Sequence, residues 1–76
     1  MIREHDQVVL TENLPDLALE AGDVGVVVHI HGDHQAYEVE FLTLAGETTA
    51  LATLRADQVR SVRSREIPHV RERLAA

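Results

Sequence analysis

The chain has 76 residues, no cysteine and a formal net charge of −6, which together predict one small acidic domain. The lack of cysteine excludes disulfides, thiolate nucleophiles and thiolate metal sites, and it fits a reducing compartment. No apolar run approaches the roughly 18 residues that a membrane-spanning helix needs, and the charged N-terminus lacks the apolar stretch of a signal peptide. We therefore expect a cytoplasmic protein.

Charge is divided unevenly along the chain. Residues 1–54 hold ten acidic residues and one arginine, a net of −9, whereas residues 55–76 hold six arginines and three acidic residues, a net of +3. An acidic body repels phosphate backbones, because nucleic-acid affinity rests mainly on cationic side chains. The acidic residues either keep a small protein soluble or form a face that binds a basic protein partner.

Short β-branched runs predict the first two strands. Residues 6–11 predict a strand, and Pro15 with its neighbours predicts a turn that folds back over one end of the fold and can include one helical turn. Residues 24–31 predict the second strand, in which Gly25 indicates a bulge or a sharp bend. A period of two places the histidines outside and the even-numbered side chains inside, namely Val24, Val26, Val28 and Ile30.

The third strand alternates strictly between apolar and acidic residues. Tyr37, Val39 and Phe41 are predicted to face the core, and Glu38 and Glu40 to face solvent. A loop over residues 32–35 then fixes the cross-strand neighbours, which lie about 5 Å apart. The expected pairs are Ile30 with Tyr37, Val28 with Val39, and His29 with Glu38.

The rest of the chain completes the predicted fold. Gly46 marks a second hairpin turn, residues 49–54 predict the fourth strand, residues 55–58 a 3₁₀ turn, and residues 59–63 a fifth strand with Val59 or Val62 facing inward. These elements predict an all-β fold, a small SH3-like five-stranded antiparallel barrel over residues 1–63.

A C-terminal helix or flexible tail is expected over residues 64–76. Ile67, Val70 and Leu74 fall at helical spacing, which is typical of a short amphipathic helix. Pro68 interrupts the pattern a few residues after the candidate cap Ser64. The sequence therefore leaves both alternatives open.

Three histidines form the one cluster with metal-like spacing. His29 and His31 lie two apart on one strand and so point the same way, and His34 follows in the turn. A third ligand, from His34 or from Glu38 across the hairpin, would complete a site of the kind that zinc uses. The alternative is a cross-strand pair of His29 and Glu38 whose strength varies near neutral pH.

The sequence offers little for catalysis, and we expect a protein that is not an enzyme and holds no cofactor. Ser61 and Ser64 lie far along the chain from most of the histidines, and Glu38 and Glu40 read as a solvated sheet face rather than as an acid and base. Both aromatic residues, Tyr37 and Phe41, are predicted inward, whereas proline-rich ligands and single strands need exposed aromatic platforms.

Four blocks of sequence resemble one family. They are Val8–Pro15, Leu19–Val28, Ala36–Phe41 and Ala56–Arg60, and in this order and spacing they are similar to the small bacterial proteins of domain-of-unknown-function family 4926, over residues 3–63. The resemblance implies a single SH3-like barrel and invites a toxin–antitoxin or immunity-type role. Similar barrels in nitrile hydratase β-subunits and their accessory relatives imply subunit contacts. No catalytic residue carries over.

Three hypotheses follow from these observations. The first is a non-enzymatic module that binds a protein partner through an acidic outer sheet face, Glu38, Glu40 and Glu47, and that can also form a homodimer by strand addition. The second is a metal-binding protein that uses His29, His31 and His34. The third is an RNA- or ribosome-associated barrel of the KOW type that uses the arginine-rich end.

Overall fold

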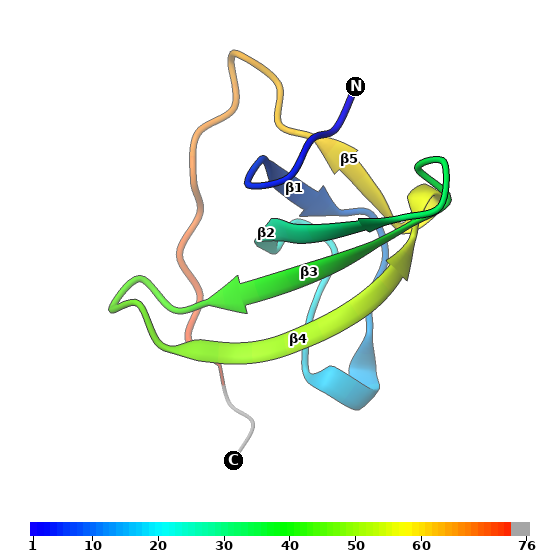
Figure 1. The fold of residues 1–76 in the computed structure, drawn as a ribbon. Coiled ribbons are helices and arrows are strands. Elements are labelled where there is room, and N and C mark those ends of the chain that lie inside the picture. Colours follow the sequence, from blue (N-terminus) through cyan, green and yellow to red (C-terminus); the bar gives the residue numbers. More distant parts are fainter. Residues whose placement is uncertain (74–76) are drawn as a thin grey trace.

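The computed structural model describes residues 1–73, which form one strongly curled antiparallel sheet (Figure 1). The strands are β1 (Gln7–Leu10), β2 (Val24–His31), β3 (Ala36–Leu42), β4 (Thr48–Arg55) and β5 (Val59–Ser61), in the spatial order β4-β3-β2-β1-β5. The predicted all-β class with five antiparallel strands is confirmed. Because β4 and β5 form the two edges and do not pair with each other, the sheet curls like a barrel wall without closing.

The hydrophobic core fills the concave side of the sheet. Val8, Val27 and Val39 are fully shielded from solvent, and they come from β1, β2 and β3 respectively. Burying side chains of this size stabilises the fold by about 1.5–3 kcal/mol each. The remaining members are Leu10, Leu19, Tyr37, Phe41, Ala52, Leu54 and Val59, while Val9 is buried outside this cluster.

The alternation predicted for β3 is confirmed. Tyr37, Val39 and Phe41 are buried, while Glu38 and Glu40 lie on the convex face and are partly exposed. This strand is hydrogen-bonded to β2 on one side and to β4 on the other, and all seven of its residues have a partner in β4.

The prediction for β2 is wrong in its first half. Val24 and Val28 are exposed and Val26 lies opposite Glu40 on the outward side, whereas Gly25 and Val27 face the core. The cause is a bulge between Val27 and His29, where one extra residue enters the strand and reverses the side that each later residue faces. Beyond the bulge the prediction recovers, because Ile30 packs against the core and the histidines face outward.

The hairpin register follows from the same bulge. The loop occupies residues 32–35 as expected, and the pairs Ile30–Tyr37 and His29–Glu38 are confirmed. The expected pair of Val28 with Val39 is wrong, since Val27 takes that place and Val28 is the inserted residue.

Gly25 is required by close packing rather than by a bend. A Cβ atom on this residue would lie 2.5 Å from Cγ1 of Val39 and 3.0 Å from both the carbonyl oxygen of Glu40 and Cε1 of Phe41. No side chain fits there without displacing β3, so the glycine lets the curled strands β2 and β3 approach each other.

Two single 3₁₀ turns, η1 (Pro15–Leu17) and η2 (Ala56–Gln58), complete the described elements. The loop around η1 folds back as expected, because backbone hydrogen bonds join Leu14 and Leu19 in both directions, at 2.9 and 3.1 Å. Leu14, Leu17 and Leu19 thereby cover one end of the core. The turn at η2 and the inward position of Val59 are also confirmed.

The segment after β5, residues 62–73, contains no helix. It runs as an extended chain from the end of β5 along one side of the sheet to the start of β4 (Figure 1). The helix expected over residues 64–76 is therefore wrong for residues 64–73, which form an extended chain. Ile67 and Val70 lie exposed instead of packing, and Leu74 lies outside the described residues.

Candidate functional site

Glu38 and Glu40 are held in fixed positions on the convex face of the sheet. Thr53 of β4 donates a hydrogen bond to Glu38 at 2.5 Å, and His31 of β2 contacts the same carboxylate at 3.0 Å. Thr48 donates a hydrogen bond to Glu40. The hydrogen bond from Thr53, and after it the contact with His31, lower the pKa of Glu38, so this carboxylate is anionic at neutral pH.

Glu47 does not belong to the same arrangement. It lies in the turn between β3 and β4, where its backbone pairs with Thr43 and leaves the side chain exposed. The structure thus brings together two of the three predicted partner-binding glutamates, and places the third at the end of the neighbouring hairpin.

Exposed aliphatic side chains surround the two glutamates. Leu51 is opposite Glu40 and is 62% exposed, and Val24 and Val28 are exposed on β2. We call Val24, Val28, Glu38, Glu40 and Leu51 the outer face. Sequence reasoning missed its apolar part, because two of these residues were assigned to the core of β2. The outer face combines negative charge with apolar surface, which is a composition suited to a partner with basic and aliphatic side chains.

The histidines are divided between two places. His29 and His31 stand side by side with ring centroids 4.7 Å apart, and His29 also lies 3.8 Å from Glu4. His34 adopts a left-handed backbone conformation in the turn, where its ring faces Tyr37 at 6.3 Å. Within residues 1–73 no group of three histidine, aspartate or glutamate side chains is arranged to hold a metal ion.

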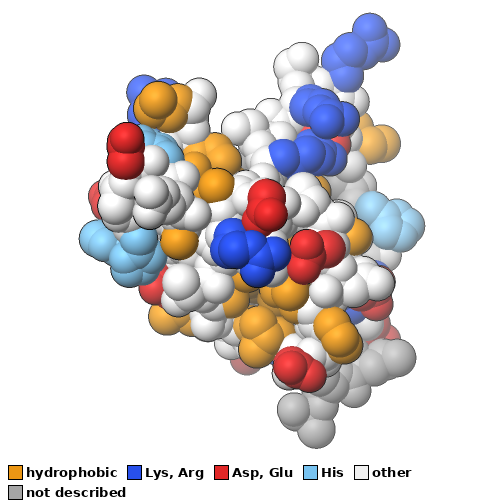
Figure 2. Space-filling model, turned by 90° about the vertical axis from the view of Figure 1, so that its right-hand side faces the viewer, with side chains coloured by type: hydrophobic (Ala, Val, Ile, Leu, Met, Phe, Trp, Pro, Cys, Tyr) orange, Lys and Arg blue, Asp and Glu red, His pale blue; other side chains and the backbone are white. Residues whose placement is uncertain are grey.

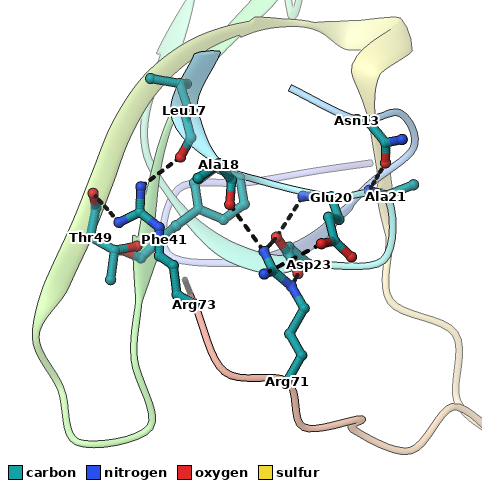
Figure 3. A network of polar contacts seen from close by, with 10 residues as sticks. All are labelled: Asn13, Leu17, Ala18, Glu20, Ala21, Asp23, Phe41, Thr49, Arg71 and Arg73. Atoms are coloured by element: carbon teal, nitrogen blue, oxygen red, sulfur yellow. Dashed lines mark hydrogen bonds and ion pairs between the residues drawn. The ribbon is translucent and has the colours of Figure 1, made fainter. Parts of the chain in front are cut away.

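A second polar network fastens the C-terminal segment to the acidic loop before β2 (Figure 3). Arg71 donates to both carboxylate oxygens of Asp23, lies 3.6 Å from the carboxylate of Glu20, and donates to the carbonyl oxygen of Ala18 at 3.2 Å. Burial alone would raise the pKa of Asp23, but hydrogen bonds from Arg71 and from the backbone N–H of Glu20 outweigh it and lower that pKa.

Arg73 joins two elements that do not otherwise pair. Its guanidinium donates to the carbonyl oxygen of Thr49 in β4 at 3.0 Å and to that of Leu17 in η1 at 2.6 Å (Figure 3). The sequence left residues 64–76 open as a helix or a tail and did not predict the contacts of either arginine. The signal that could have located them is the contrast in charge between the acidic body and the arginine-rich end.

An ion pair holds the other end of the segment. Arg60 of β5 forms a bidentate pair with Glu66, at 2.9 and 2.6 Å, and the backbone N–H of Arg63 donates to the same carboxylate. These contacts lower the pKa of Glu66 to about 2. The arginine-rich end is thus partly engaged within the protein.

The described surface has shallow grooves. One, of about 460 Å³, lies between η1 and β4, and another, of about 410 Å³, lies beside Arg71. Figure 2 shows a face on which acidic, basic and hydrophobic side chains are intermixed, with arginine side chains gathered toward the upper right. That face does not present a surface of one sign of charge.

Comparison with known proteins places the chain in a family. The model of the family described as Domain of unknown function (DUF4926) matches residues 4–61, which is most of the chain, and the chain belongs to that family. The match covers all five strands and ends where the C-terminal segment begins. No curated protein and no solved structure matches the chain. No helix within the described range is long and apolar enough to cross a membrane.

Proposed function

We propose that this protein is a non-enzymatic interaction module that binds a protein partner in the cytoplasm through its outer face. The observation that carries the proposal is the placement of two hydrogen-bonded glutamates among exposed aliphatic side chains on one continuous sheet surface. Because these carboxylates are already positioned by threonines, a partner meets them with little further loss of conformational freedom.

The chemistry of the outer face specifies the partner. Two carboxylates attract lysine or arginine, and the neighbouring Leu51 and Val28 offer apolar contact of the kind that supplies most binding free energy. An antitoxin, immunity or accessory-subunit role agrees with such a partner. The engagement of Arg60, Arg71 and Arg73 with carboxylates and carbonyls favours this proposal over an RNA-binding one.

Self-association is a second expected interaction. β4 is an edge strand whose residues Thr48 to Leu54 carry no charge, and charges or prolines are what usually protect such an edge. Arg73 and Gln58 bond the backbone near its two ends, at Thr49 and Arg55, which leaves Leu51 and Thr53 for pairing with a second copy. Light scattering during size-exclusion chromatography, over a range of concentrations, measures this directly.

A comparative capture experiment tests the proposal. Tagged wild-type protein, the charge-reversed variant Glu38→Arg/Glu40→Arg and a control variant Asp16→Arg/Asp33→Arg are used as bait in lysate of the source organism. The control changes net charge equally, at exposed carboxylates away from the outer face. We expect one stoichiometric protein that the wild type and the control retain and the charge-reversed variant loses. Equal retention by all three baits would refute the proposal for the outer face.

A further inference from the structure

The C-terminal segment is held to the body by arginine side chains and very little else. Every residue from Ser61 to Val70 is exposed, including Ile67 at 88% and Val70 at 71%. After the Arg60–Glu66 pair, the contacts that fix the segment in the described structure are those of Arg71 and Arg73. The segment is therefore a tethered ligand rather than a part of the core.

The surface that receives the two arginines has the form of a guanidinium-binding site. We use that name for the carboxylates of Glu20 and Asp23 and the carbonyl oxygens of Leu17, Ala18 and Thr49. Ala18 adopts a left-handed backbone conformation, with φ of 55°, and its carbonyl accepts from the same guanidinium that Asp23 binds through both oxygens. A planar guanidinium matches such a set of acceptors, whereas the compact ammonium of lysine does not.

The site does not satisfy every donor of the tethered segment. The Nε atom of Arg73 is buried and has no hydrogen-bond partner among residues 1–73. A buried donor without an acceptor is costly, so an arginine that enters from a slightly different direction can bind more favourably than Arg73 does.

We propose that the guanidinium-binding site is a docking site for an extended segment of a partner protein that carries two arginines two residues apart, and that residues 71–73 occupy it in the free protein. The proposal deepens the proposed function, on which it rests, by adding a second surface with a defined ligand. Charge favours this occupant, because the body is acidic and Arg71 and Arg73 of the tethered segment already meet acceptors there.

Tethering makes a quantitative prediction. A segment on a short flexible linker competes at an effective concentration of about 1 mM. If the free peptide and the tethered segment share a Kd of about 0.1 mM, this effective concentration is about ten times that Kd. The peptide should therefore bind the wild-type protein roughly tenfold more weakly than it binds a variant whose own arginines are removed.

The experiment uses a fluorescent peptide with the sequence of residues 67–73, titrated into full-length wild type and into Arg71→Ala/Arg73→Ala. We expect binding to be about tenfold tighter in the variant. Adding Asp23→Asn to the variant should weaken it again by about tenfold or more, because a carboxylate that accepts two guanidinium bonds is lost. Adding Asp33→Asn instead, in the exposed turn between β2 and β3, is the matched control and should change nothing.

Two further measurements keep the proposal refutable. If circular dichroism shows that Arg71→Ala/Arg73→Ala does not fold, Arg71→Lys/Arg73→Lys replaces it. This variant keeps both positive charges but lacks the planar guanidinium groups, and it should still bind the peptide more tightly than wild type does. A peptide with lysine at both arginine positions should bind at least tenfold more weakly. Equal binding by wild type and variant, or equal binding of both peptides, would overturn the proposal.

The result of the peptide titration does not depend on the outer face. The peptide titration contains no natural partner, and Glu38→Arg/Glu40→Arg, added to the arginine-free variant, should leave peptide affinity unchanged. A failed titration would thus refute the guanidinium-binding site alone, and a failed capture experiment would refute the outer face alone.

Discussion

Substitution of Gly25 by alanine tests the packing between β2 and β3. The new Cβ atom would lie 2.5 Å from a methyl carbon of Val39 and 3.0 Å from the carbonyl oxygen of Glu40. The first contact is closer than real side chains allow, and the second involves a backbone atom that cannot move without shifting β3. Overpacking of this kind costs about 1–3 kcal/mol, so the Tm should fall by roughly 5–20 °C in a domain of this size.

If β2 faced the other way, the expected effect of Gly25→Ala on stability would have the opposite sign. If Gly25 faced solvent, alanine would fit without strain and would stabilise the strand by about 0.5–1 kcal/mol, since glycine loses more conformational freedom on folding. Urea unfolding monitored by circular dichroism separates the two cases. A double-mutant cycle with Val39→Ala adds a control, because removing the clashing methyl should recover part of the loss. A stability of Gly25→Ala equal to or above that of wild type would refute the packing described for β2.

Two further predictions concern the bulge and the C-terminal segment. Val27→Ala should lower the free energy of unfolding by about 1–3 kcal/mol, whereas Val28→Ala should change it by less than about 0.5 kcal/mol. Without the bulge, Val28 would face inward together with Ile30, so a larger loss at Val28 than at Val27 would refute the bulge. Because the folded-state pKa of Glu66 is lowered to about 2, its contribution to stability is present above its usual pKa of about 4.3 and is lost as pH falls toward 2. Glu66→Gln should therefore flatten the pH dependence of Tm over that window, and an unchanged profile would show that the pair with Arg60 does not form in solution.

The sequence predicts β3 and its hairpin well because their pattern allows one arrangement. Polar and apolar residues alternate without interruption from Tyr37 to Phe41, so one face must be the core. In β2, by contrast, the residues from Val26 to Val28 are apolar at both odd and even positions. Periodicity cannot choose between the two faces there, and the choice is made by the bulge and by the space that only Gly25 leaves.

In the candidate sites, likewise, contacts between residues close in sequence could be predicted and contacts between distant residues could not. The pairing of His29 with Glu38 could be predicted, since a four-residue turn sets it. The contacts of Arg71 and Arg73 could not, because they join residues 48 and 56 positions apart, Arg71 with Asp23 and Arg73 with Leu17. The helical spacing of Ile67 and Val70 suggested a helix, where contacts of Arg60, Arg71 and Arg73 instead hold an extended chain.

The measurement that tests the outer face most directly is an NMR footprint of the captured partner on isotope-labelled protein. We expect the largest chemical-shift changes at Val28, Glu38, Glu40 and Leu51, and we expect Glu38→Arg/Glu40→Arg to abolish them. Changes confined to β5 or to Ile67 and Val70, with the outer face unaffected, would contradict this expectation.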